Sequence, residues 1–437
     1  MQRRLILAAA LSGSIMVITP AATALAQDNP SEAELRARVA ELEKKMADMD
    51  AAQQDGRMTE ARAAEVRAIV HDVLADADTR ASLLQGGMTA GWDRKFFLAS
   101  SDGNFKMNVE GQMQFRWVLN LQDEQAGDST RYGFENRRTK LNFNGHVFDP
   151  TWEYEVQGAF DRDGGSFILE TATITRDLGN DWYVKFGQFK PGFMREELTS
   201  SKRQLAVERS LVNEEFNQDY TQGIEVGYAG EQFKIWGSFD DGFGSDNTAA
   251  LAEDVEYSLT GRAEILFAGS WDQFKDFTSW KDEEFAFMMG AAGHVEREES
   301  GTPGSAEETV FTWTIDASLE FGGANIFAAV VGRHFDESDA DQFGFVLQGG
   351  VFLTDDWEAF ARFEWGDMDV SGQDDLLVAT VGVNRYWKKH SLKWTTDIGI
   401  GLNEVASGWS SSGAGWRGDA SDEDGQVVVR SQLQLLF

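Results

Sequence analysis

The sequence predicts an all-β transmembrane fold: an antiparallel β-barrel of about 16 strands, preceded by a short α-helical coiled-coil segment. Three observations indicate it: segments that alternate apolar and polar residues, tight turns that alternate with long loops, and a final amphipathic strand ending in Phe437. Residues 105–121 show the alternation best, because every odd position except Gly111 is apolar. A strand sends successive side chains to opposite faces, so this segment has one apolar and one polar face.

An apolar face of this length fits either a soluble β-sandwich or a barrel that turns it toward lipid around a wet lumen. The connections favour the barrel, since tight turns such as 148–150 and 178–180 alternate with long polar loops. Four tryptophans near short turns would form an aromatic belt at one rim: Trp152, Trp182, Trp357 and Trp387. The long segment 268–282 lies on a turn side, and the pattern gives no account of it.

Sixteen segments fit a barrel strand by their alternation and by the turn residues that bound them. Two of them, 166–177 and 256–268, alternate poorly. The predicted strands are 105–121, 132–148, 152–160, 166–177, 181–189, 221–230, 231–241, 256–268, 283–297, 308–322, 323–336, 341–353, 356–367, 376–387, 390–403 and 426–437.

Composition excludes several classes of function. The chain holds 73 acidic and 39 basic residues, for a net charge of −34, which would repel nucleic acid. It has no cysteine, so disulfides and thiolate metal sites are excluded, and we expect no metal centre and no cofactor. Its five histidines are scattered and no G-x-S-x-G motif accompanies them, so we expect no enzymatic activity.

The N-terminal region predicts two segments before the barrel domain, which we place at residues 88–437. Residues 1–26 have the charged start, the apolar run and the A-x-A end of a signal peptide. Residues 27–87 have a helical period and predict a periplasmic coiled coil, although a single amphipathic helix remains the alternative. The heptad positions are Leu35, Val39, Leu42, Met46 and Met49.

Three stretches carry a family resemblance. Residues 187–201 read G-Q-F-K-P-G-F-M-R-E-E-L-T-S-S, residues 208–214 read E-R-S-L-V-N-E, and residues 134–141 read F-E-N-R-R-T-K-L. They resemble the hallmark segments of the phosphate-selective porin O and P family. The resemblance implies a homotrimeric, sixteen-stranded pore in the outer membrane of a Gram-negative-type bacterium, with a third external loop, near residues 190–217, folded inward to constrict the lumen.

The same resemblance implies anion selectivity from basic residues at the constriction. The hallmark loop supplies five candidates, and three more lie on the polar parity of their strands. The candidates are Lys190, Arg195, Lys202, Arg203, Arg209, Arg116, Arg138 and Lys140. The opposing interpretation is that these side chains pair with neighbouring acids and hold the loop against the wall.

The sequence therefore predicts a water-filled channel for passive diffusion of small hydrophilic or ionic solutes, and the resemblance adds anions such as phosphate as candidate solutes. The alternative is a structural protein whose coiled coil links the barrel to the cell wall. The expected partners are the lipid bilayer, lipopolysaccharide, two further copies of the chain, and the outer-membrane insertion machinery, which would recognise Phe437. Acidic external loops could bind divalent cations that bridge lipopolysaccharide.

Overall fold

The computed structural model describes residues 40–45, 87–122, 129–250, 255–299, 307–420 and 424–437. The chain divides into two compact units, Met1–Gln85 and Gly86–Phe437. In the first unit only residues 40–45 are described, and they are helical. The predicted signal peptide and most of the predicted helical segment lie outside the described residues, and six helical residues do not support a coiled coil. No described helix is long and apolar enough to cross a membrane.

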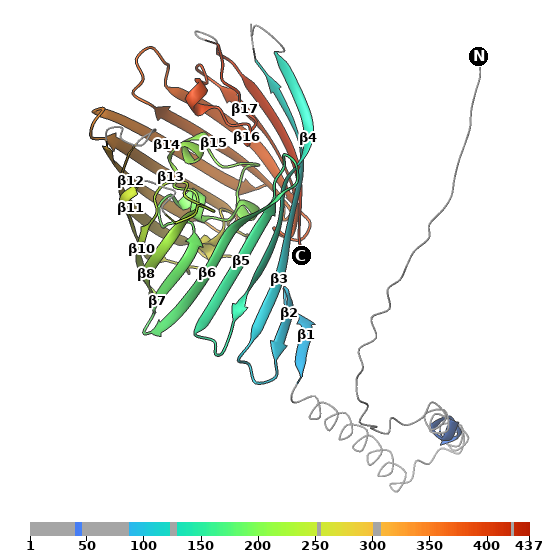
Figure 1. Ribbon diagram of the computed structural model, residues 1–437. Helices are drawn as coiled ribbons and strands as arrows, with labels where there is room; N and C mark the ends of the chain where they lie inside the picture. The colour runs from blue at the N-terminus through green and yellow to red at the C-terminus, as the bar shows by residue number, and fades with distance from the viewer. Residues whose placement is uncertain (1–39, 46–86, 123–128, 251–254, 300–306, 421–423) are drawn as a thin grey trace, which may run out of the picture. The chain divides into compact units, whose positions relative to one another are not determined.

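In the second unit, strands β3 to β18 form a closed antiparallel barrel (Figure 1). Each strand pairs with the next, and β18 closes the ring on β3. The strands are β3 Lys106–Leu121, β4 Thr130–His146, β5 Trp152–Phe160, β6 Phe167–Gly179, β7 Trp182–Phe189, β8 Thr221–Ala229, β9 Phe233–Asp240, β10 Val255–Ala268, β11 Ala286–Glu299, β12 Glu307–Glu320, β13 Ala324–Phe335, β14 Ala340–Phe352, β15 Trp357–Asp367, β16 Leu376–Tyr386, β17 Leu392–Gly401 and β18 Val427–Leu436. All sixteen predicted strands are confirmed, with ends that differ by a few residues.

The two faces of each strand have opposite environments, and this decides between sandwich and barrel. On β3, Met113 and Phe115 are 46% and 49% exposed, whereas Gln114 between them is 1% exposed. A soluble protein buries its apolar side chains and exposes its polar ones. Here the order is reversed around the ring, as lipid on the outside and a polar interior require.

Two short strands were not predicted. β1 (Met88–Trp92) and β2 (Phe96–Ser100) form a hairpin, and β2 pairs with residues 106–109 of β3. β18 pairs with residues 112–121 along the same edge of β3. The hairpin therefore extends the barrel wall past the end of β18. Five-residue strands reading M-T-A-G-W and F-F-L-A-S alternate too briefly to be recognised from sequence.

β3 has one glycine on its apolar face, Gly111. It lies at the seam, where β18 closes the barrel on β3. The Gly111 amide donates to the Phe437 carbonyl at 2.7 Å, and the Phe437 amide donates back at 3.1 Å. A Cβ at Gly111 would lie 2.2 Å from the Phe437 ring. Glycine at this position therefore makes room for the terminal aromatic ring where the barrel closes.

Three segments fold inward between the strands, and each carries short helical turns. The inward loop (residues 190–220) contains α3 (Arg195–Leu198), η1 (Ser201–Arg203) and α4 (Leu211–Phe216). The turn-side segment (residues 269–285) contains η2 (Gln273–Lys275), and the loop-side cap (residues 402–420) contains η3 (Ser407–Trp409). Figure 1 shows the inward loop inside the ring of strands.

Candidate functional site: the lumen and its inward loop

The inward loop rests on one side of the barrel through apolar packing. Its buried side chains join inward-facing residues of β13 to β16 and the cap in one hydrophobic cluster. The loop contributes Phe193, Met194, Leu205, Leu211, Val212 and Phe216, and the wall contributes Phe327, Val331, Val346, Phe360, Leu376 and Val378. Burial of this apolar surface holds the loop against the wall.

Polar side chains of β15 to β17 bind the backbone of the same loop. Five such hydrogen bonds have lengths of 2.5–2.9 Å and join Lys393 to Gln204, Asn384 to Leu205, Asp397 to Val207, Arg362 to Glu208 and Glu364 to Leu211. Arg430 of β18 in turn holds the Asp397 carboxylate at 2.7 Å. These charges lie on the inner face, yet they are buried beneath the loop and do not meet solute.

Glu208 joins the loop to β3 and β4, which follow β18 around the wall. Its carboxylate lies 2.6 Å from Arg116 of β3 and 2.8 Å and 2.7 Å from Arg137 and Arg138 of β4. Burial alone would raise the pKa of Glu208, but the three guanidinium groups outweigh it and hold the pKa well below its usual range. The E-R-S-L-V-N and F-E-N-R-R-T-K-L stretches therefore meet at a buried cluster of charges.

A β-bulge explains how two consecutive arginines reach the same carboxylate. Gln114 pairs with Arg138 and the next residue, Phe115, pairs with Asn136, so Arg137 has no partner across the strand pair. Simple alternation would turn Arg137 toward lipid. The extra residue at a bulge re-aims the side chain, and Arg137 contacts Glu208 from the inside.

The loop is also closed on itself by its own hallmark residues. The Glu196 carboxylate accepts from the amide and hydroxyl of Ser210 at 2.8 and 2.6 Å. The Arg209 guanidinium donates to the carbonyls of Glu196 and Thr199 at 3.0 Å each. Ser210 caps the N-terminus of α4 by accepting from the Asn213 amide at 2.9 Å. The loop therefore has a defined internal structure.

The turn-side segment, which the sequence pattern does not explain, contacts the inward loop. Arg195 donates to the Phe274 carbonyl at 2.5 Å, and the Phe277 amide donates to the Arg203 carbonyl at 3.4 Å. Farther along, Trp280 packs against Tyr386 with ring centroids 5.0 Å apart. Phe277 of this segment joins the hydrophobic cluster that packs the loop against the wall.

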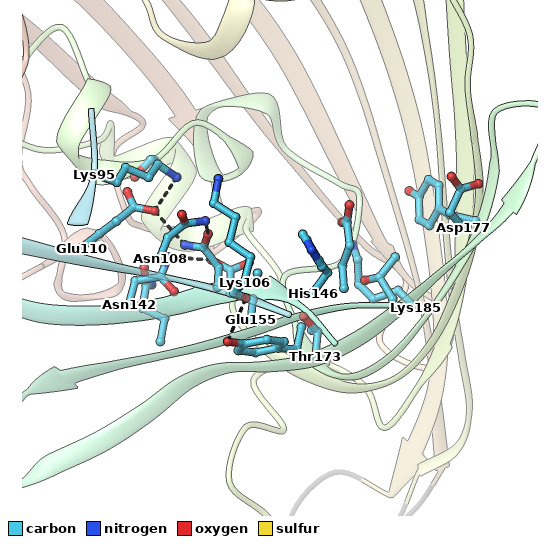
Figure 2. Close-up of a pocket in the computed structure, with 18 of the residues that line it drawn as sticks. Lys95, Lys106, Asn108, Glu110, Asn142, His146, Glu155, Thr173, Asp177 and Lys185 are labelled. Atoms are coloured by element: carbon cyan, nitrogen blue, oxygen red, sulfur yellow. Dashed lines mark hydrogen bonds and ion pairs between the residues drawn. The ribbon is translucent and has the colours of Figure 1, made fainter. Parts of the chain in front are cut away.

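The other side of the lumen, along β3 to β7, stays open. A cavity of about 1150 Å³ lies there, lined by polar residues of the wall and by Lys202 and Arg203 of the loop. Figure 2 shows Lys95 of the hairpin donating to Glu110 (2.6 Å), and Lys202 lies 3.6 Å from the same carboxylate. Solute passing through the barrel meets this wide polar space.

A narrower cavity of about 240 Å³ adjoins it, where the loop faces β4 to β7. Four basic side chains line it, against the two carboxylates of Glu155 and Glu197. The bases are Lys140, Lys185, Lys190 and Arg209. Lys140 and Lys185 are paired with Glu170 (2.6 Å) and Glu225 (2.7 Å), but these two carboxylates do not line the cavity.

The structure separates the eight candidate residues into three groups. The narrow cavity brings together Lys140, Lys190 and Arg209, and the wide cavity is lined by Lys202 and Arg203. The remaining three, Arg116, Arg138 and Arg195, are buried in contacts that hold the loop, and Arg195 also lines a cavity on the side of β7 to β10. Lys185 was missed as a candidate, although its place on the polar parity of β7 could have identified it.

A closed barrel with an apolar outer face, a polar lumen and an inward loop defines an outer-membrane channel of the porin type. This fold and site indicate a channel rather than an enzyme. The chain belongs to the phosphate-selective porin O and P family, whose model matches residues 107–394.

Known proteins share this architecture at low identity. An uncharacterized protein of Aquifex aeolicus (strain VF5) is 22% identical over 329 residues, which are 69% of this chain and 76% of that protein. The anion-selective porin from Comamonas acidovorans is 13% identical with a TM-score of 0.54, covering 76% of this chain and 99% of its own. The trimer form of OmpT, an outer membrane protein of Vibrio cholerae, is 12% identical with a TM-score of 0.52, at 76% and 99% coverage. These two similarities establish the shared fold.

Proposed function

We propose that this protein is a passive diffusion pore for small hydrophilic ions, with a preference for anions such as phosphate. The observation that supports the preference is the narrow cavity, where four basic side chains face two carboxylates. A ring of like charges at the narrowest part of a water-filled channel raises the local concentration of the opposite ion. The similar fold of an anion-selective porin is consistent with this proposal.

The pairing of the bases argues for a modest preference. Each of Lys140, Lys185 and Lys190 has a carboxylate partner, so an anion at the constriction competes with a neighbouring acid. Conduction requires that ions enter readily and leave readily, and strong binding would prevent their release. We therefore expect a pore that favours anions without holding them.

Reversal potentials in planar bilayers under a KCl gradient test the proposal. Replacing Lys140, Lys185 and Lys190 together by Gln should shift the reversal potential toward cations, whereas the matched Arg replacements should retain the anion preference. Lys106→Gln, in the wide cavity, is the control and should have a smaller effect. Purified protein without step conductance would refute the pore. Step conductance with the same reversal potential in the Gln variant would refute the anion filter.

We further propose that the pore is a homotrimer in the outer membrane, with residues 27–87 in the periplasm after removal of residues 1–26. The trimer form of the Vibrio cholerae protein, which has this fold, supports the stoichiometry. The position of Phe437 at the barrel seam supports recognition of the C-terminal strand by the insertion machinery. External loops would meet lipopolysaccharide. Size-exclusion chromatography with light scattering in detergent tests the stoichiometry.

A further inference from the structure

A third cavity in the lumen differs in chemistry from the other two. This aromatic chamber, of about 790 Å³, lies between the wall from β7 to β10, the inward loop and the turn-side segment. Its aromatic lining includes Tyr183, Trp236, Trp271 and Phe274. Its basic lining residues are Lys185, Lys190, Arg195, Arg203, Lys234 and Lys275. Three carboxylates face these six bases: Glu155, Glu225 and Glu264.

Two of the chamber's cations have no carboxylate partner among the residues that the structure describes. Lys234 lies with its ammonium nitrogen 4.2 Å from the centre of the Trp271 ring. Arg203 donates to the carbonyl of Lys275 at 3.5 Å. Two facing acids are already neutralised, Glu225 by Lys185 at 2.7 Å and Glu264 by Arg262 at 2.9 Å. The chamber therefore keeps positive charge available for an anion.

The aromatic side chains beside these cations are held in place. The Trp271 indole N–H donates to the Gly230 carbonyl at 3.0 Å, which fixes the ring at the edge of the chamber. The Trp236 indole packs on the backbone at Gly192, where a Cβ would lie 1.8 Å from the ring nitrogen. Fixed aromatic faces beside cations suit a flat anionic ligand.

We propose that the aromatic chamber binds aromatic carboxylates during their passage, with the ring against Trp236 and Trp271 and the carboxylate against Lys234 or Arg203. The volume lies within the usual range for small-molecule sites. Inorganic phosphate would use the cations alone, and a saturated carboxylate would lose the aromatic contact. The proposal names a substrate class for the pore and so rests on the proposed function.

Two measurements with defined probes test it. Isothermal titration calorimetry of the full chain in detergent compares benzoate with cyclohexanecarboxylate, which has similar size and charge but no aromatic ring. Benzoate should bind roughly tenfold more tightly. Block of the KCl current in planar bilayers should show the same order of affinities, with phosphate the weakest blocker.

Variants separate the chamber from the rest of the lumen. Lys234→Gln should weaken benzoate binding by roughly tenfold, Lys234→Arg should retain it, and Trp271→Phe should reduce it less than Trp271→Ala. Lys106→Gln is the control and should change nothing, because Lys106 lines the wide cavity and has no carboxylate partner among the described residues. Equal binding of benzoate and cyclohexanecarboxylate would overturn the proposal. Selective benzoate binding by a protein without step conductance would support the chamber and refute the pore.

Discussion

The two halves of the lumen have the same strand pattern but opposite contents. Along β13 to β16, inward positions include large apolar residues such as Phe327, Val346 and Leu376, and the inward loop packs against them. Along β4 to β7, inward positions are polar, as at Asn142, Gln157 and Thr173, and cavities lie in front of them. The apolar residues on one inner wall therefore decide where the loop rests and leave the other wall to the solute.

An inward-facing charge has two different roles in this barrel. Arg362 on the packed side donates to the loop backbone and is buried, whereas Lys185 on the open side lines the narrow cavity. Both residues follow the same alternation. What distinguishes them is whether a partner from the inward loop covers the side chain. A selectivity filter in this fold must be sought on the wall that the loop leaves open.

The largest expected effect comes from Glu208, which links the two halves. Glu208→Gln removes the carboxylate that pairs with Arg116, Arg137 and Arg138. Arg116 keeps its ion pair with Glu135, but the buried cluster of three guanidinium groups loses its central negative charge. Breaking such a cluster costs about 3–5 kcal/mol. We expect the loop to leave the wall, so that single-channel conductance rises and becomes noisy.

Glu153→Gln is the matched control, because Glu153 lines the wide cavity and makes no ion pair among the described residues. It should leave conductance and thermal stability close to those of the unmodified protein. The midpoint of thermal unfolding in detergent gives an independent measure of the Glu208 substitution. A Glu208→Gln protein with unaltered conductance and midpoint would show that apolar packing alone holds the loop.

A smaller effect is expected from the packed half. Leu211→Ala removes a side chain that is 2% exposed, where the loop meets the wall. The loop can relax toward the cavity, so we expect about 2–3 kcal/mol, at the lower end of the range for such substitutions. Leu259→Ala on the lipid face of β10 is the control. Equal loss of thermal stability in both variants would contradict a specific role for the loop–wall contact.

The sequence predicted the sixteen strands because lipid requires apolar residues at alternate positions over a long stretch. It could not predict the contacts of the inward loop, since Arg116 and Glu208 are 92 positions apart. Alternation also misplaces Arg137, whose inward direction depends on a bulge. The hydrophobic cluster inside the barrel was hidden for the same reason: an apolar residue on the inner face looks like an irregularity until the loop that covers it is known.

The same limit applies to the candidate site. Eight bases were proposed from the hallmark loop and from strand parity, and the structure distributes them among three cavities and the buried contacts. The parity of a strand position indicates that its side chain faces the lumen. It does not indicate which half of the lumen the side chain faces. Residue 185 shares that face with the others and could have been included, whereas the aromatic chamber depends on a segment, 269–285, that no strand pattern describes.

The smallest expected effect is a pH dependence of ion selectivity. It should come from a lysine in the open half of the lumen and not from one in the packed half. Burial, together with the nearby positive charge of Arg209, lowers the pKa of Lys190 well below the ordinary lysine value of 10.5. A lysine with a lowered pKa loses its positive charge at a lower pH than a free lysine, so the anion preference should fall as pH rises through that value. Reversal potentials measured from about pH 6 to about pH 10 should show this fall in the unmodified protein and a flatter curve in Lys190→Gln. Lys393→Gln, which changes a lysine covered by the loop, is the control and should retain the fall of the reversal potential with pH. Identical curves for the unmodified protein and Lys190→Gln would assign the titration to another group.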